Sequence, residues 1–217
     1  MKYLNDEKTI CTHGDYIYTL KEGGWSVKLN EKVTDRNQTT YGEILSEIDG
    51  EPVTYLPYTF MACKDLIDAP KIPESIKYIG GAFYGCTSLK VAPVIPNGVI
   101  DMPYTFEECT SLTTAPTIPS SVTDMNGTFE DCTSLTTAPT ISNSVTDMYG
   151  TFNGCTSLTG EVEINASNLE PDFECFYGTE KPITLTGTSP YLNEIADWYD
   201  NVSIKRSRNE PSYDEER

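Results

Sequence analysis

Apolar residues recur along the middle of this chain with a fixed period of 23 residues, and mostly threonine, serine, glycine and proline separate them. The largest apolar residue of each repeat is a phenylalanine, found at Phe60, Phe83, Phe106, Phe129 and Phe152. A cysteine follows each phenylalanine after three residues, and a leucine follows after six. Stacked solenoids produce such a period, because each unit buries its apolar face only against its neighbours. The pattern therefore predicts one elongated solenoid.

Each repeat contains two short apolar stretches that predict strands. In the unit that starts at Leu112, we expect one strand over 112–118 and a second over 122–125. Pro116 and Pro119 cannot donate a hydrogen bond to a neighbouring strand, so the first strand should be brief and irregular.

The link between one repeat and the next matches a helix-start motif. Thr105 with Glu108, and Thr128 with Asp131, have the spacing of the capping box, in which a hydroxyl and an acid bind the free amides of a first helical turn. We therefore expect one helical turn per repeat, with phenylalanine and cysteine pointing inward.

The segment before the repeats predicts an N-terminal cap over 1–52. Apolar and polar residues alternate over 16–20 and again over 25–29, with two glycines between them, which indicates a β-hairpin. An open solenoid needs its end covered, so this hairpin is expected to cap a solenoid that occupies 53–185.

The segment after the repeats predicts a second cap. Ser189 and Pro190 form a helix start, and the apolar residues that follow give a short amphipathic helix, so we expect a capping helix and an edge strand over 186–204. The polar residues 205–217 are expected to be a disordered tail.

Two stretches resemble the BspA-like class of leucine-rich repeats. The first is Pro-Glu-Ser-Ile-Lys-Tyr-Ile-Gly-Gly-Ala-Phe-Tyr-Gly-Cys-Thr-Ser-Leu over 73–89, and the second is Ile-Pro-Ser-Ser-Val-Thr-Asp-Met-Asn-Gly-Thr-Phe-Glu-Asp-Cys-Thr-Ser-Leu over 118–135. The resemblance covers about 53–185 and implies a mainly β, right-handed solenoid of about five units. It also implies function by protein contact, without catalytic residues, as in bacterial surface proteins and in phage or mobile-element proteins.

Five of the seven cysteines share one repeat phase. Stacked side chains point in parallel, so they neither face each other for disulfides nor converge on a zinc ion. We expect these thiols to be free and buried, acting as small apolar groups. Cys11 and Cys175 lie outside the phase, and their state stays open.

Charge is distributed unevenly along the chain. The net charge is −18, and between Lys90 and Lys181 there is no basic residue but there are 13 acidic ones. Such a surface repels nucleic acid and anionic membranes and attracts basic partners. The alternative interpretation is that acidity simply keeps the solenoid soluble and monomeric.

The repeat stacks acidic residues of successive units on one another. Glu107 should lie on Glu130, and Glu108 on Asp131, which gives four carboxylates in one patch. We expect this patch to bind a basic protein surface. The alternative is that acids at a helix start serve only to stabilise that helix.

A second acidic ladder consists of Asp101, Asp124 and Asp147, expected about 5 Å apart. Neighbours would repel by about 1 kcal/mol in water and about 3 kcal/mol at an effective dielectric constant of 20. Hydrogen bonds from nearby hydroxyl or amide groups would offset this repulsion; the functional alternative is a calcium ion or a basic side chain of a partner. Asp124 and Asp147 are included in the predicted partner surface, and no metal or cofactor is expected.

Catalysis is not expected. His13 is the only histidine and lies near Cys11 and Asp15 in the N-terminal segment, but a nucleophile and base two residues apart do not form a recognised catalytic arrangement. No phosphate-binding loop or nucleophile elbow occurs.

The first residues lack a secretory signal, and no apolar run has the length of a membrane span. The sequence as written therefore predicts a cytoplasmic protein, although a chain whose signal had been removed would read the same and be extracellular.

The sequence thus favours a monomeric, non-enzymatic, protein-binding module whose acidic surface docks on a basic protein. A nucleic-acid-handling protein is a specific partner class, and by analogy the chain would suit a phage-encoded inhibitor of host defence. The competing hypothesis is a bacterial surface or virion module for adhesion or structure.

Overall fold

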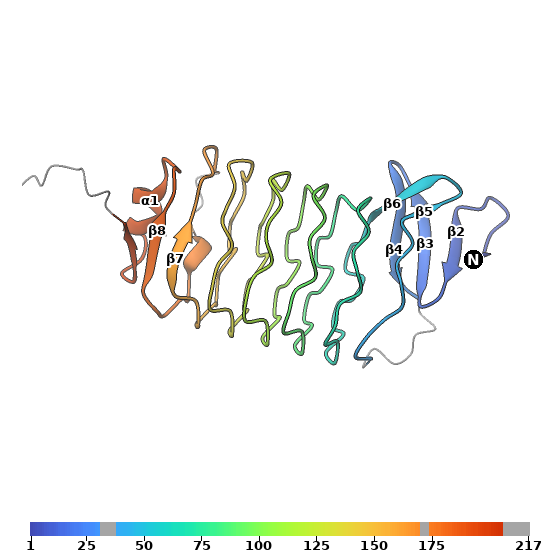
Figure 1. Cartoon of the computed structure of the whole chain (residues 1–217), viewed down its shortest axis with the longest axis horizontal. Helices are drawn as coiled ribbons and strands as arrows, with labels where there is room; N and C mark the ends of the chain where they lie inside the picture. The colour runs from blue at the N-terminus through green and yellow to red at the C-terminus, as the bar shows by residue number, and fades with distance from the viewer. Residues whose placement is uncertain (31–37, 170–173, 206–217) are drawn as a thin grey trace, which may run out of the picture.

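The computed structural model describes residues 1–30, 38–169 and 174–205 of the 217. Successive coils of the chain stack along the long axis of the molecule, with the blue N-terminal sheet at one end and the red C-terminal elements at the other (Figure 1). The molecule is therefore an elongated β-rich solenoid, as the 23-residue period predicts.

The N-terminal end is a six-stranded sheet in the order β1-β2-β3-β4-β6-β5. The alternating residues predicted as a hairpin form β3 and β4, which pair antiparallel from Tyr16 with Leu29 to Lys21 with Gly24. β6 pairs parallel with β4 and leads into the first coil, so the sheet is continuous with the solenoid. The strands are β1 Lys2–Tyr3, β2 Ile10–His13, β3 Tyr16–Lys21, β4 Gly24–Leu29, β5 Glu47–Ile48 and β6 Glu51–Tyr55.

The central coils pair through single β-bridges, not through strands. One parallel ladder joins Tyr55, Tyr78, Asp101, Asp124 and Asp147, and a second joins Val91, Thr114 and Thr137. The strands expected over 112–118 and 122–125 are therefore wrong in extent, since only Thr114 and Asp124 form bridges there. Proline supplies no amide hydrogen, which explains why pairing on the 112–118 side does not extend beyond a single residue.

The expected helical turn in each repeat is also wrong. The Phe106 and Glu108 amides donate to carbonyls of the following coil, at 2.9 and 2.8 Å, so they are not available for a helix. Tyr104 and Glu108 have φ of 55° and 57°, the left-handed conformation that ends a helix. Thr105 does not cap: its hydroxyl donates to the carbonyls of Met102 and Ile79, at 2.7 and 3.2 Å. Each link is a series of β-turns.

The core is a column of stacked side chains. Consecutive phenylalanine rings from Phe60 to Phe176 are nearly parallel, with centroids 5.3–5.8 Å apart. All seven cysteines are buried thiols, including Cys11 and Cys175. Thiols of the ladder donate to a phenylalanine carbonyl of the preceding coil, as Cys132 does to Phe106 O at 3.0 Å. The cysteines are part of the packing, as expected.

The C-terminal end is a three-stranded parallel sheet in the order β7-β8-β9. Its strands are β7 Gly160–Glu163, β8 Ile183–Thr186 and β9 Val202–Ile204, accompanied by a 3-10 turn η1 Glu174–Phe176 and a helix α1 Leu192–Asp197. The helix starts after Tyr191 instead of at the predicted Ser189, whose hydroxyl accepts the Tyr191 amide at 3.3 Å. Of the predicted tail, all but Lys205 lies outside the described residues.

Candidate protein-binding surface

Four carboxylates meet on the turns of two neighbouring coils, and we call this group the acidic turn face: Glu107, Glu108, Glu130 and Asp131. The Glu108 amide donates to Glu130 O at 2.8 Å, which fixes the two turns in register. Glu107 and Glu130 are partly buried, whereas Glu108 and Asp131 are exposed. The stacking expected from the 23-residue spacing therefore occurs, although turns and not helix starts produce it.

The acidic turn face has an unfavourable electrostatic environment. Burial, followed by the charges of Glu130, Glu108 and Asp131, raises the pKa of Glu107 to about 7. Burial and Asp131 likewise raise the pKa of Glu130, while a hydrogen bond of 2.9 Å from Asn153 Nδ2 opposes that rise. Among the described residues, the single ion pair is Lys205 with Glu161, so no basic side chain forms an ion pair with these carboxylates.

Tyrosines line the same face, and the sequence interpretation missed them. The Tyr84 hydroxyl donates to Glu108 Oε1 at 3.1 Å. Tyr104 lies over Gly127, where an added Cβ would be 2.4 Å from Tyr104 Cδ1. The same Cβ would be 3.3 Å from Glu130 Oε2, so Tyr104 and Glu130 lie over the same glycine. Burial, followed by Glu107 and Glu130, raises the pKa of Tyr104. The signal that could have found this packing is the alternation of tyrosine and glycine at one phase: Tyr58, Gly81, Tyr104 and Gly127.

The aspartate ladder runs beside the turns and has its own hydrogen bonds. Asp101 Oδ1 accepts the Thr123 hydroxyl at 3.2 Å. Asp124 Oδ1 and Asp147 Oδ1 each accept the amide two residues ahead, at 2.8 and 2.9 Å. Hydroxyl and amide donors thus offset part of the repulsion among these aspartates, as the sequence analysis expected. Within the described part of the chain, no group of three or more histidine, cysteine or acidic side chains has an arrangement that could hold a metal ion.

The residues around His13 do not form a polar cluster. Cys11 is fully buried, and burial is the main cause that raises the pKa of its thiol. His13 lies at the exposed end of β2. A buried thiol with a raised pKa is a poor nucleophile.

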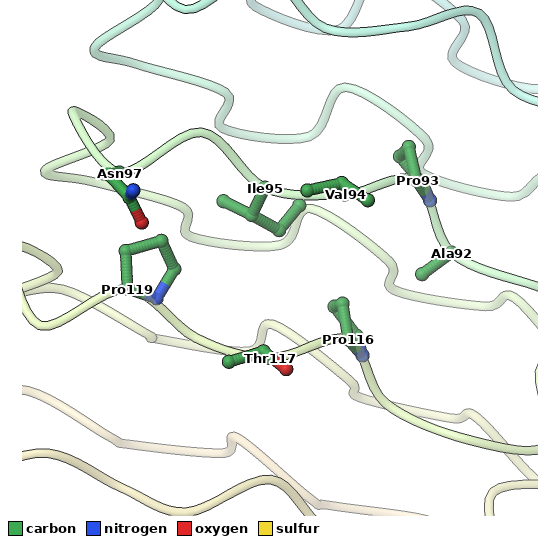
Figure 2. A pocket seen from close by; sticks show the side chains of 8 residues that line it. All are labelled: Ala92, Pro93, Val94, Ile95, Asn97, Pro116, Thr117 and Pro119. Carbon is green, nitrogen blue, oxygen red and sulfur yellow. The ribbon is translucent and has the colours of Figure 1, made fainter.

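A second surface feature is a hollow between two coils, lined by proline and short apolar side chains. Figure 2 shows the segment with Pro93, Val94 and Ile95 facing the segment with Pro116 and Pro119. Val94 is 84% exposed. Because proline prevents backbone pairing here, neighbouring coils leave shallow apolar hollows on this side.

The comparisons with known proteins identify the repeat. The family described as "BspA type Leucine rich repeat region" matches residues 55–190 in six copies. The chain belongs to this BspA-type leucine-rich-repeat family. Leucine-rich repeats are typically non-enzymatic binding modules, and most of this chain consists of them. A search of the curated proteins gives no match.

Two solved bacterial proteins have a similar fold. A leucine rich cell surface protein of Faecalibacterium prausnitzii A2-165 is 22% identical over 88% of this chain, with a TM-score of 0.57. The T. pallidum leucine rich repeat protein is 20% identical over 82%, with a TM-score of 0.50, and the match covers 91% of it. The BspA-type chain spans 57% of the Faecalibacterium protein. No helix within the described residues is long and apolar enough to cross a membrane.

Proposed function

We propose that this BspA-type protein binds another protein by docking a basic surface on the acidic turn face. The observation that supports this most is that four carboxylates gather on adjacent turns with no ion-pair partner among the described residues, and that burial, followed by the neighbouring carboxylates, raises the pKa of Glu107 to about 7. A cation placed between them would relieve this repulsion. Repulsion among these carboxylates thus lowers the stability of the fold at a place where a positively charged ligand would restore it.

The proposal predicts that binding and proton release are linked. At neutral pH a fraction of Glu107 is protonated, because its pKa is about 7. A bound cation favours the ionised carboxylate, so docking expels that proton. Affinity should therefore increase as the pH rises through 7, in contrast to an interaction that depends on histidine in the partner.

The tyrosines favour arginine over lysine as the docking residue. A guanidinium group stacks on aromatic rings and forms paired hydrogen bonds with carboxylates, whereas an ammonium group is a more strongly hydrated point charge. Tyr104 and Glu130, which lie over the same glycine, offer both kinds of contact within one small area. Asp124 and Asp147, on the adjacent ladder, extend the negative surface.

A nucleic-acid-handling protein is the partner class that fits best, since its phosphate-binding groove presents arginine side chains to a row of negative charges. The narrower form of the proposal is a phage-encoded inhibitor that occupies such a groove in a host defence protein. Inhibition of a purified nucleic-acid-binding protein, relieved by high salt, would support this form.

The test uses a variant with Lys at all four positions of the acidic turn face. A matched control changes the same charge elsewhere, at the exposed acids Asp6, Glu7, Glu22 and Glu43. Binding to an arginine-rich peptide and to a lysine-rich peptide of equal charge is measured by calorimetry at low and high salt. We expect tighter binding of the arginine peptide, lost in the first variant and kept in the control. If both variants lost peptide affinity equally, net charge alone would explain the binding, and the proposal would be contradicted.

A second candidate function is adhesion at a bacterial or virion surface. The observation that favours it is the similarity in fold to a protein described as a leucine rich cell surface protein. Binding of the purified chain to intact cells, at a strength that neither salt nor the fourfold Lys substitution changes, would favour this candidate.

A further inference from the structure

Three asparagines of the chain precede a glycine: Asn97, Asn126 and Asn153. In such a pair the glycine amide nitrogen can attack the asparagine side-chain carbonyl, because glycine has no side chain to hinder the approach. The three pairs therefore have the same local chemistry, and any difference in reactivity must come from the fold.

The fold protects two of these pairs. The amide of Gly127 donates to Tyr149 O, and that of Gly154 donates to Tyr177 O, each at 2.8 Å. Asn153 is held further by the hydrogen bond from its side chain to Glu130. A nitrogen whose hydrogen is bound to the next coil cannot attack without breaking the contact between coils.

Asn97 and Gly98 lack this protection. Asn97 is exposed, and Figure 2 shows its side chain at the edge of the proline-lined hollow, directed toward Pro119. Among the described residues, the Gly98 amide makes no hydrogen bond to another backbone group. Proline at 96 and the following turn place the pair on the surface of the coil, where water has access.

Two neighbours make the Gly98 nitrogen more reactive. Lys77 Nζ lies against this glycine, 2.5 Å from the point that a Cβ of residue 98 would occupy. The Ser121 hydroxyl has two acceptors, Val99 O and, at 2.8 Å, Asn97 O, the carbonyl of the peptide bond that contains the Gly98 nitrogen. When this nitrogen loses its proton, negative charge is shared between nitrogen and oxygen. The ammonium and the hydroxyl are placed to stabilise that charge.

We propose that Asn97 is a site of spontaneous deamidation, promoted by Lys77 and Ser121. A water or hydroxide takes the Gly98 amide proton, and the nitrogen attacks Asn97 Cγ. The bond from Cγ to the side-chain nitrogen breaks, and ammonia leaves with a proton from solvent, giving a succinimide. Water then opens either carbonyl, so that asparagine and water become aspartate or isoaspartate and ammonia.

The modification would change the proline-lined hollow. It adds one carboxylate beside Pro119 and Lys77, and the isoaspartate form also lengthens the backbone at this turn. The site is separate from the acidic turn face, so the inference does not depend on the proposed function.

The test incubates the folded full-length chain in mildly alkaline buffer and follows peptides by mass spectrometry, which detects replacement of an amide by an acid. We expect Asn97 to react while Asn126 and Asn153 remain intact. In the urea-unfolded chain, all three should react at similar rates. Lys77→Gln should slow the reaction at Asn97 about fivefold, the factor for a unit charge about 4 Å away in water. Ser121→Ala should slow it as well.

Equal rates at the three asparagines in the folded chain would overturn the inference, because unfolding would then explain the reaction. An unchanged rate in both the Lys77→Gln and Ser121→Ala variants would overturn the assignment of their roles. Circular dichroism and a thermal melt of each variant establish that it is folded, so a slower reaction cannot be attributed to loss of structure.

Discussion

At the residue scale, the most unusual groups are carboxylates that the repeat brings together. Glu107 and Glu130 occupy equivalent positions in neighbouring coils, and both are partly buried. The aspartate ladder is stacked in the same way, yet Asp101, Asp124 and Asp147 accept hydrogen bonds from hydroxyl or amide groups. Like charges in one repeat phase are thus tolerated in two ways: the ladder accepts hydrogen bonds at each of its three aspartates, whereas on the acidic turn face burial is the main cause that raises the pKa of Glu107 and Glu130.

Glu107 should make stability depend on pH. Its pKa rises from 4.5 to about 7 on folding, so between these values the folded state holds a proton that the unfolded state has released. The free energy of unfolding should therefore decrease as the pH rises through this window. Thermal melts across it should show a falling melting temperature, and Glu107→Gln should flatten the curve. Gln at the exposed Glu43 is the control, and an unchanged slope in Glu107→Gln would contradict the prediction.

Calcium should not stabilise the aspartate ladder. Its carboxylates already accept hydrogen bonds, and the described residues include no cluster arranged for a metal ion. Melting temperatures with millimolar calcium and with chelator should agree. A clear rise with calcium that Asp124→Asn removes would show that the ladder binds the ion.

At the element scale, the unit of this fold is a turn-rich coil with two left-handed residues. Tyr104 and Glu108 have these conformations in one coil, as Gly127 and Asp131 do in the next. Left-handed residues other than glycine are disfavoured by about 1–2 kcal/mol. Their amides donate hydrogen bonds to the next coil, as Glu108 N does to Glu130 O, and these bonds link neighbouring coils. Hydrogen bonding between coils therefore overrides the local preference for a helix start.

Glycine at 127 should be required for two separable reasons. Gly127 and Gly14 have φ of 56° and 54°, but a Cβ would meet the Tyr104 ring only at 127. Gly14→Ala should cost about 1 kcal/mol from conformation alone. Gly127→Ala should cost about 1–3 kcal/mol more, the usual range for overpacking. Urea unfolding measures both, and adding Tyr104→Ala to Gly127→Ala should recover the difference; no recovery would exclude the tyrosine contact as its cause.

At the scale of the whole molecule, an apolar column holds together a strongly charged surface. The phenylalanine stack runs from Phe60 to Phe176, while the chain has a net charge of −18. All basic residues lie outside 91–180. The centre of the solenoid is therefore the part of the sequence that is free of the protein's own cationic side chains.

Salt should stabilise this protein. Counter-ions screen repulsion between exposed acids, so the melting temperature should rise from low to physiological ionic strength. A variant with Gln at 107, 108 and 130 and Asn at 131 neutralises the acidic turn face. Its melting temperature at low salt should be higher than that of the original chain, and added salt should raise it less. If salt raised the melting temperature of this variant as much as that of the original chain, the acidic turn face would not be a centre of electrostatic repulsion.

The repeat, the family and the inward residues all follow from the amino-acid sequence alone. Phe106 and Cys109 are buried as their spacing predicts, because a 23-residue period places equivalent side chains in one column whatever the local backbone. The same period places Glu107 and Glu130 at equivalent positions of neighbouring coils. Side chains in a solenoid have few neighbours outside the adjacent coils, so spacing alone predicts these contacts.

The local backbone conformation and the environment of each charge depend on how the coils pack in three dimensions. Thr105 and Glu108 match a capping box in sequence, but hydrogen bonds with adjacent coils require turns there. The packing of Tyr104 over Gly127, the raised pKa of Glu107 and the unprotected amide of Gly98 likewise depend on distances between coils. The period of a sequence predicts which residues of neighbouring coils lie next to each other. The burial of these residues and the geometry of their hydrogen bonds arise only when the coils have stacked.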